Sequence, residues 1–371
     1  MGSKYELTLT SDYVKDWSIT EALREFFQNA IDQSKVSGKD YSYHYDPDRE
    51  ELTLINPNSW LDRSTLLLGK SSKTDDSSSI GQFGEGYKLA CLVLLRNNVS
   101  IEIRNDNYKE VWRPTLKPSR RFNGEKILTF DIDGRLCYSH STDKNLVIII
   151  SNLSKDAWET YKQYNLNICP PNETLDTDKG SVLLEEKYSG QVYVCGLFVG
   201  SFTDLKYGYN FPADIISLDR DRKVLPAFNT LQATSDVWRL TDSDLIIPLL
   251  EESCADVHYI DWGYIRAAKT SVGEKSYNSF KEKYGEASYP VTNQSEMEAL
   301  AKISPELKPI IVPESYKSFL VKTSLLPDIS SDVKHATSLK GRLEILRDEI
   351  QGKLTTEELQ ELNDIISKMW S

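Results

Sequence analysis

The chain has 371 residues, of which 39% are hydrophobic, and this is enough for two domains with real cores and a third small element. Its formal net charge of −12 argues against broad, nonspecific binding of nucleic acid, which a basic surface would favour. No apolar run reaches the length of a membrane-crossing helix, no secretory signal opens the chain, and the five cysteines are scattered, so we expect a cytoplasmic protein with reduced thiols.

The first predicted element is a helix over residues 20–35. Glu25, Asn29 and Asp32 stand at i, i+4 and i+7, so a helix presents all three polar groups on one face. Most other positions are apolar and would pack on a sheet. A carboxylate and a carboxamide on a helix built for burial are costly to hide unless they serve a ligand. The alternative is a solvated polar stripe on an ordinary amphipathic helix.

A strand over 51–56 comes next, and a polar segment at 69–86 leads into a helix over 87–97. Gly81, Gly84 and Gly86 let the backbone approach a ligand, and the unpaired amides that open the helix suit a phosphate. The spacing is not that of a dinucleotide-binding Gly-x-Gly-x-x-Gly directly after a strand. A P-loop also fails, because Ser64 stands where that motif needs its first glycine.

Further strands are predicted at 99–104, 126–131 and 146–150, and a strand or hairpin at 191–199 opens a second unit. Beyond about residue 270 the chain is more polar and is interrupted by prolines. Two leucine- and isoleucine-rich helical patterns end it, with a capping box at Thr355 and Glu358 between them. This helical hairpin either docks on its own domain or binds a partner or a second copy.

Four segments, in chain order, resemble motifs of the GHKL superfamily of ATPases. The superfamily is named for gyrase, the ninety-kilodalton heat-shock chaperones, histidine kinases and the mismatch-repair protein MutL. The glycine segment is especially similar to the chaperone branch and to the MORC-type ATPases. The four segments, which span roughly residues 10–190, are Leu23-Arg24-Glu25-Phe26-Phe27-Gln28-Asn29-Ala30-Ile31-Asp32, Leu68-Gly69-Lys70-Ser71-Ser72-Lys73, Ile80-Gly81-Gln82-Phe83-Gly84-Glu85-Gly86-Tyr87 and Gly180-Ser181-Val182-Leu183.

The resemblance implies an α+β fold in three parts. A Bergerat-type α/β sandwich would bind ATP over 1–190, followed by a transducer-like αβ domain over 191–270 and a mostly helical region over 271–371. In this family a mobile lid covers ATP, which would bring Lys73 near the phosphates. A late strand hydroxyl, here Ser181, helps to hold adenine. A basic residue of the second domain reaches the γ-phosphate, and Arg220 and Lys223 are the candidates, although such charges can equally be solvated.

The chain departs from the family after the strand at 51–56. The family has Asp-x-Gly-x-Gly there, and its Asp accepts a hydrogen bond from the adenine amino group. Here Asn56 replaces the Asp, and Asn58 and Trp60 replace the glycines. The Asn56 amide can accept but also donate, so we expect looser discrimination between ATP and GTP than a carboxylate gives. Asn58 tolerates a left-handed backbone, whereas Trp60 adds bulk that packs under the lid or stacks on the base.

The resemblance thus implies slow, Mg-dependent hydrolysis of ATP. Mg²⁺ prefers oxygen ligands and keeps several waters, so the amide oxygen of Asn29 and the phosphates suffice. Glu25, one turn away, would be the general base for the attacking water. We expect ATP to close the lid and associate two subunits as a conformational switch that an unknown protein partner senses.

Three alternatives remain open. Glu25 can instead be a structural ion-pair partner of Arg24. Asn56 and Trp60 make a non-hydrolysing, nucleotide-sensing module credible, and a turnover assay separates it from an ATPase. A histidine kinase shares this pocket, but it needs a phosphoacceptor histidine in a long helical pair upstream, and only about 20 residues precede the first motif.

Overall fold

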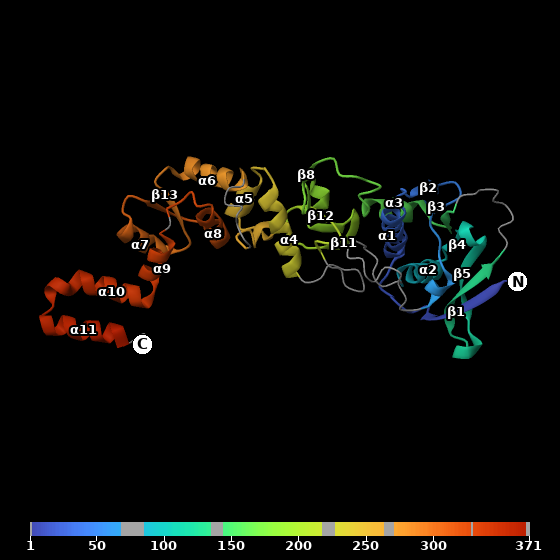
Figure 1. Cartoon of the computed structure of the whole chain (residues 1–371), viewed down its shortest axis with the longest axis horizontal. Coiled ribbons are helices and arrows are strands. Elements are labelled where there is room, and N and C mark those ends of the chain that lie inside the picture. The colour runs from blue at the N-terminus through green and yellow to red at the C-terminus, as the bar shows by residue number, and fades with distance from the viewer. Residues whose placement is uncertain are drawn as a thin grey trace. The chain divides into compact units, whose positions relative to one another are not determined.

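The computed structural model describes residues 2–67, 85–134, 144–216, 227–262, 271–327 and 329–368 (Figure 1). The chain folds into two compact units. The first comprises Met1–Asn172, Val192–Gly200 and Asn210–Val224, and the second comprises Glu173–Gln191, Ser201–Tyr209 and Leu225–Ser371. Of the two boundaries predicted from the sequence, the one at 190 falls next to a change between these units, and the one at 270 does not.

An antiparallel sheet of seven strands lies in the first unit. Helices α1 (Ile19–Ser37), α2 (Gly86–Arg96) and α3 (Lys155–Gln163) belong to the same unit (Figure 1). In sheet order the strands are β1 (Ser3–Thr10), β6 (Lys126–Asp133), β5 (Glu110–Pro118), β4 (Ser100–Asn105), β7 (Leu146–Ser151), β3 (Glu51–Asn56) and β2 (Ser42–Asp46).

The two faces of this sheet differ in character. Successive side chains of a strand point to opposite faces, and one face, with residues such as Leu54, Ile103 and Phe130, joins the apolar side chains of α1 and α2 in one core. The other face carries ion pairs such as that between Glu102 and Arg113, whose atoms approach to 2.9 Å. An antiparallel sheet commonly packs one face on the core and leaves the other in water.

Local signals set the ends of α1. Ser18 Oγ accepts a 3.1 Å hydrogen bond from Thr20 N, and the Glu21 carboxylate accepts a 2.7 Å bond from Ser18 N. This reciprocal capping satisfies donors that the first turn would otherwise leave open. Gly38 ends the helix in the left-handed region with φ of 65°, which costs glycine little. The predicted helix over 20–35 is therefore confirmed.

Other predicted elements of the first unit are also confirmed. The strand over 51–56 is β3, the helix over 87–97 is α2, and the strands at 99–104, 126–131 and 146–150 are β4, β6 and β7. The chain therefore has a mixed α+β fold. The edge strands β1 and β2 and the strand β5 were not predicted, although β1 alternates polar and apolar residues and buries Leu7 and Leu9.

A second sheet has five strands. β10 (Gln191–Val194) and β11 (Leu197–Ser201) form the hairpin predicted at 191–199. Cys195 and Gly196 at its turn have φ of 50° and 80°, and positive φ at both central positions suits a two-residue hairpin turn. The strand order is β11, β10, β12 (Gly208–Phe211), β9 (Gly180–Leu183) and β8 (Thr174–Thr177).

From residue 227 onward, within the second unit, the described residues are mostly helical. Strands β13 (Ser288–Val291) and β14 (Lys308–Ile311) pair in parallel, with helix α7 (Gln294–Ile303) between them in the chain. The predicted C-terminal pair of helices is confirmed, and Thr355 N donates to Glu358 Oε2 at 2.8 Å in the predicted capping box. The other helices are α4 (Ala227–Leu240), α5 (Ile246–Glu251), α6 (Ser271–Tyr284), α8 (Glu314–Lys322), α9 (Ser330–Thr337), α10 (Leu339–Ile350) and α11 (Thr356–Lys368).

Candidate functional site

The predicted polar face of α1 is largely buried. Glu25 is 0% exposed and Asp32 is 2% exposed, whereas Asn29 between them is part-exposed. A solvated polar stripe is therefore excluded for Glu25 and Asp32. Glu25 Oε1 lies 3.6 Å from Nη2 of Arg24. The alternative in which Glu25 is a structural ion-pair partner of Arg24 therefore stays open.

Asn56 at the end of β3 is bonded to α1. Its Nδ2 donates a 3.0 Å hydrogen bond to the main-chain oxygen of Ala30, and its side chain is 3% exposed. A carbonyl oxygen only accepts, so the amide nitrogen must face α1 and Oδ1 is left to meet a ligand. No group among the described residues donates to Oδ1. Oδ1 of Asn56 can therefore accept a hydrogen bond from a ligand, as a carboxylate oxygen would.

The residues after Asn56 hold a tight turn. Asn58 has φ of 51°, so it adopts the left-handed conformation that was expected of it in place of a glycine. Ser59 N donates to Lys144 O at 2.9 Å, which ties the turn to the residues before β7. Trp60 is 46% exposed, so within the described residues it is not packed into a core.

The strand beside Asn56 and the strand that carries Ser181 belong to different sheets. In the seven-stranded sheet β7 lies beside β3, and Asn56 is opposite Leu146. Ser181 lies on β9, a strand of the five-stranded sheet. The strand that begins beside Asn56 is therefore β7. The sequence predicted a strand there but gave no signal of its pairing, which depends on the packing of the whole sheet.

Gly86 opens α2 and is buried. The side chain of Glu85 at the N-cap forms no capping hydrogen bond, so no N-cap side chain satisfies the first-turn amides. Such amides and the positive end of the helix dipole favour an anion. Because α1 and α2 pack against each other, this helix start and the polar face of α1 belong to one layer of the first unit.

Lys88 in the first turn of α2 is a residue that sequence analysis missed. Its side chain is 0% exposed, and Nζ donates to the main-chain oxygens of Thr65 and Leu67, at 2.8 Å in both cases. Burial lowers the pKa of Lys88 to about 8, and the charge of Glu85 opposes this shift. The available signal was a lysine within an otherwise apolar helical pattern.

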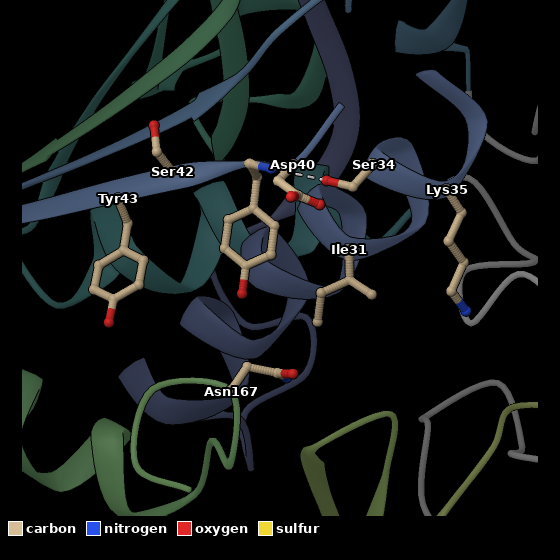
Figure 2. A pocket seen from close by; sticks show the side chains of 8 residues that line it. Ile31, Ser34, Lys35, Asp40, Ser42, Tyr43 and Asn167 are labelled. Atoms are coloured by element: carbon tan, nitrogen blue, oxygen red, sulfur yellow. Dashed lines mark hydrogen bonds between the residues drawn. The ribbon is translucent and has the colours of Figure 1, made fainter. Parts of the chain in front are cut away.

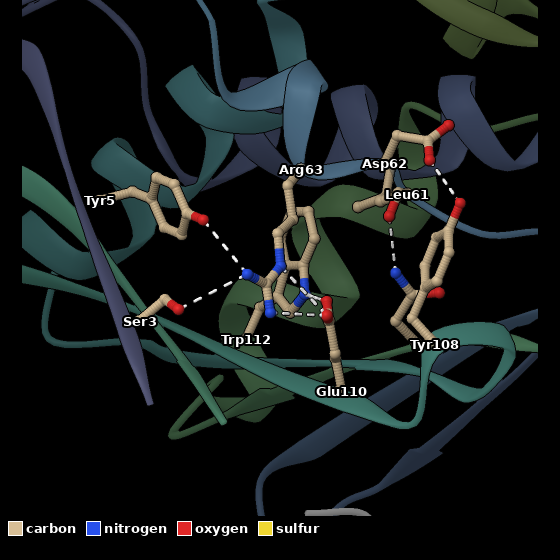
Figure 3. A network of polar contacts seen from close by, with 9 residues as sticks. Ser3, Tyr5, Leu61, Asp62, Arg63, Tyr108, Glu110 and Trp112 are labelled. Carbon is tan, nitrogen blue, oxygen red and sulfur yellow. Dashed lines mark hydrogen bonds and ion pairs between the residues drawn. The ribbon is translucent and has the colours of Figure 1, made fainter. Parts of the chain in front are cut away.

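A polar network braces the residues just before these two acceptors (Figure 3). The Glu110 carboxylate is its centre, because it accepts from Arg63 Nη2 and from Trp112 Nε1, both at 2.8 Å. Asn105 Nδ2 donates to Leu61 O at 2.7 Å, and the Tyr108 hydroxyl donates to the Asp62 carboxylate. Residues 61–63 are therefore fixed to β4, to β5 and to the turn between them.

A cavity of about 760 Å³ lies elsewhere on α1 (Figure 2). At 100° per residue, Ser34 on its wall stands half a turn around the helix from Glu25. The cavity is therefore separate from the polar face that carries Glu25. Its lining residues are Ile31, Ser34, Lys35, Asp40, Tyr41, Ser42, Tyr43 and Asn167.

The structure groups only some of the predicted site residues. Glu25, Asn29 and Asp32 share one stretch of α1, Asn56 bonds to that stretch, and Gly86 opens the helix packed beside it. Of the other predicted residues, Ser181 lies on β9 of the five-stranded sheet, and Lys73, Gly81, Gly84, Arg220 and Lys223 lie outside the described residues.

The described residues contain neither a metal-binding cluster of side chains nor a membrane-crossing helix. No group of three or more His, Cys, Asp or Glu side chains there could hold a metal ion, so a metal at Asn29 would depend on ligand oxygens and water. Within the same described ranges, no helix is both long and apolar enough to cross a membrane.

No family model matches the chain. A protein of Mycoplasma pneumoniae (strain ATCC 29342 / M129) named "Uncharacterized protein" is 23% identical over 218 residues. The match covers 57% of this chain and 86% of that protein. Its name assigns no activity, so the function has to be argued from the site.

Proposed function

We propose that the chain binds Mg-ATP against α1 and hydrolyses it slowly. The observation that carries this proposal is the burial of a carboxylate, Glu25, one turn from the part-exposed amide of Asn29. Keeping such groups on a helix packed in a core is costly for folding, and a bound, charged ligand is a reason to keep them.

Each part of the nucleotide has a candidate partner. Asn29 offers Mg²⁺ an amide oxygen, and the phosphates and water complete its coordination. The first-turn amides of α2 would receive a phosphate. Oδ1 of Asn56 would accept a hydrogen bond from the amino group of adenine, since its amide nitrogen is already bonded to Ala30.

Hydrolysis needs little covalent chemistry from the protein, mainly positioning and charge neutralisation. Glu25 would accept a proton from the water that attacks the γ-phosphate. ATP-dependent association of two subunits, and a Bergerat-type arrangement of this α+β unit, belong to the same proposal.

The experiment is a steady-state assay of phosphate release by the full chain, with Mg²⁺ and with excess chelator. We expect slow turnover of ATP that requires Mg²⁺. Nucleotide binding without turnover would favour the non-hydrolysing sensor instead. Size measurement by light scattering, with and without a non-hydrolysable ATP analogue, tests the nucleotide-dependent dimer. The absence of both binding and turnover would contradict the proposal.

A further inference from the structure

Lys88 carries a buried charge, and none of the roles proposed above for nucleotide binding or hydrolysis involves it. Its Nζ bonds to two neutral carbonyl oxygens, those of Thr65 and Leu67. No carboxylate among the described residues forms an ion pair with it. A buried ammonium group without a carboxylate partner is costly, and an apolar side chain of similar length would fill the same space without that cost.

A second buried lysine, Lys281, provides a comparison, because its only role is to hold two main-chain oxygens in place. Lys281 is 8% exposed, and its Nζ donates to Glu286 O at 2.6 Å and to Ser288 O at 2.9 Å. It lies in the last turn of α6, where a cation complements the negative end of the helix dipole. Lys88 lies in the first turn of α2, where the same dipole opposes a cation.

The position of Lys88 therefore calls for a compensating anion. Side chains of a helix lean toward its N-terminus, so the ammonium group lies toward the end of α2 that Gly86 opens. Its acceptors, Thr65 and Leu67, lie two and four residues after Arg63, which the Glu110 carboxylate holds (Figure 3).

We infer that Lys88 is a binding residue that supplies its buried positive charge to the polyphosphate of the nucleotide. This inference rests on the proposed function of the same site. The charge of Lys88 would then contribute to phosphate binding together with the amides that open α2. The affinity should therefore depend on the number of phosphates on the ligand. A structural clamp would affect a nucleoside and a nucleotide equally.

A dependence on pH follows from the same geometry. The pKa of Lys88 is about 8 because of burial, and Glu85 is the carboxylate whose charge raises it. Tyr87, whose hydroxyl lies 3.0 Å from Thr65 Oγ1, has a pKa that burial raises, so it stays neutral. A bound polyphosphate favours the charged lysine and raises its pKa. Affinity should be full below about pH 8 and fall as pH rises through that value.

The test is titration of the full chain with a non-hydrolysable Mg-ATP analogue and with adenosine, between about pH 7.5 and 9.5. The terminal phosphate is already ionised in this range. We expect Lys88→Met to weaken binding of the analogue by about tenfold or more, as for charges about 8 Å apart at an effective dielectric constant of about 20, and to leave adenosine binding unchanged. Lys88→Arg, whose charge does not titrate, should make the affinity independent of pH.

The matched control is Lys281→Met, which removes the other buried lysine and should change neither ligand's affinity. If Lys88→Met does not fold, the pH profile of Lys88→Arg decides. Equal losses for the analogue and adenosine, or identical pH profiles of wild type and Lys88→Arg, would overturn the inference while the proposed function stands. If the wild type binds neither ligand, the proposed function fails and the inference fails with it.

Discussion

The amide nitrogen of Asn56 donates a 3.0 Å hydrogen bond to the main-chain oxygen of Ala30, and this bond fixes the end of β3 to α1. Ala30 follows Asn29 directly, so the bond also fixes the turn of α1 that would hold Mg²⁺. The amide nitrogen carries two hydrogens, so this bond uses one of its two donors and turns Oδ1 away from Ala30 O. Looser discrimination between ATP and GTP than a carboxylate gives stays a prediction.

Asn56→Asp should destabilise the protein by about 1–3 kcal/mol near neutral pH, because a carboxylate oxygen would then face Ala30 O without a hydrogen between them. A protonated carboxyl can donate to Ala30 O, so the fold raises the pKa of the new side chain above its ordinary value. The deficit should therefore be small at about pH 4 and grow as the pH rises. Urea unfolding of both proteins across this range measures it, and a deficit that does not change with pH contradicts the assigned bond.

Glu25→Gln should lower the turnover number by about 10²–10⁴-fold and leave the affinity for the ATP analogue nearly unchanged. Gln has the same shape but cannot take the proton of the attacking water. If Glu25 serves only Arg24, the substitution should instead lower the free energy of unfolding by about 3–5 kcal/mol, since a buried cation would lose its partner. Turnover, affinity and urea unfolding, measured on the same preparation, separate the two roles. Wild-type turnover in this variant would refute the assignment of the base.

Glu110→Gln should lower the free energy of unfolding by about 1–3 kcal/mol, because its amide would place a donor against Arg63 or Trp112. The control is Glu102→Gln, which removes the ion pairs with Arg104 and Arg113 from the solvent-facing side of the sheet and should cost about 1 kcal/mol or less. Urea unfolding compares the two. Equal effects would mean that the network around Glu110 does not brace residues 61–63.

Features that depend on neighbouring residues could be predicted from the sequence. The spacing of Glu25, Asn29 and Asp32 defines one helical face regardless of what packs on it, and the capping box at Thr355 is formed as predicted. Asn58 adopts the positive φ that its place after β3 required. In each case the physical cause acts over one or two turns of chain.

Features that join distant segments could not be predicted. The Asn56–Ala30 bond spans 26 positions and the Arg63–Glu110 pair spans 47, and no local pattern reports either. The pairing of β7 with β3 also depends on how the whole sheet packs, and no local pattern reports it. Lys88 was missed because its acceptors, Thr65 and Leu67, are main-chain atoms, which any sequence supplies.

The most direct test of the central claim is calorimetric titration of the full chain with a non-hydrolysable ATP analogue, with and without Mg²⁺. Wild type should bind saturably in a Mg²⁺-dependent manner, and Asn29→Ala should abolish that binding. Asn167→Ala, the same substitution at the separate cavity on α1, should bind as wild type does. A wild type that binds neither ATP nor GTP analogues, or an Asn29→Ala variant that keeps Mg²⁺-dependent binding, would contradict the assignment of this site.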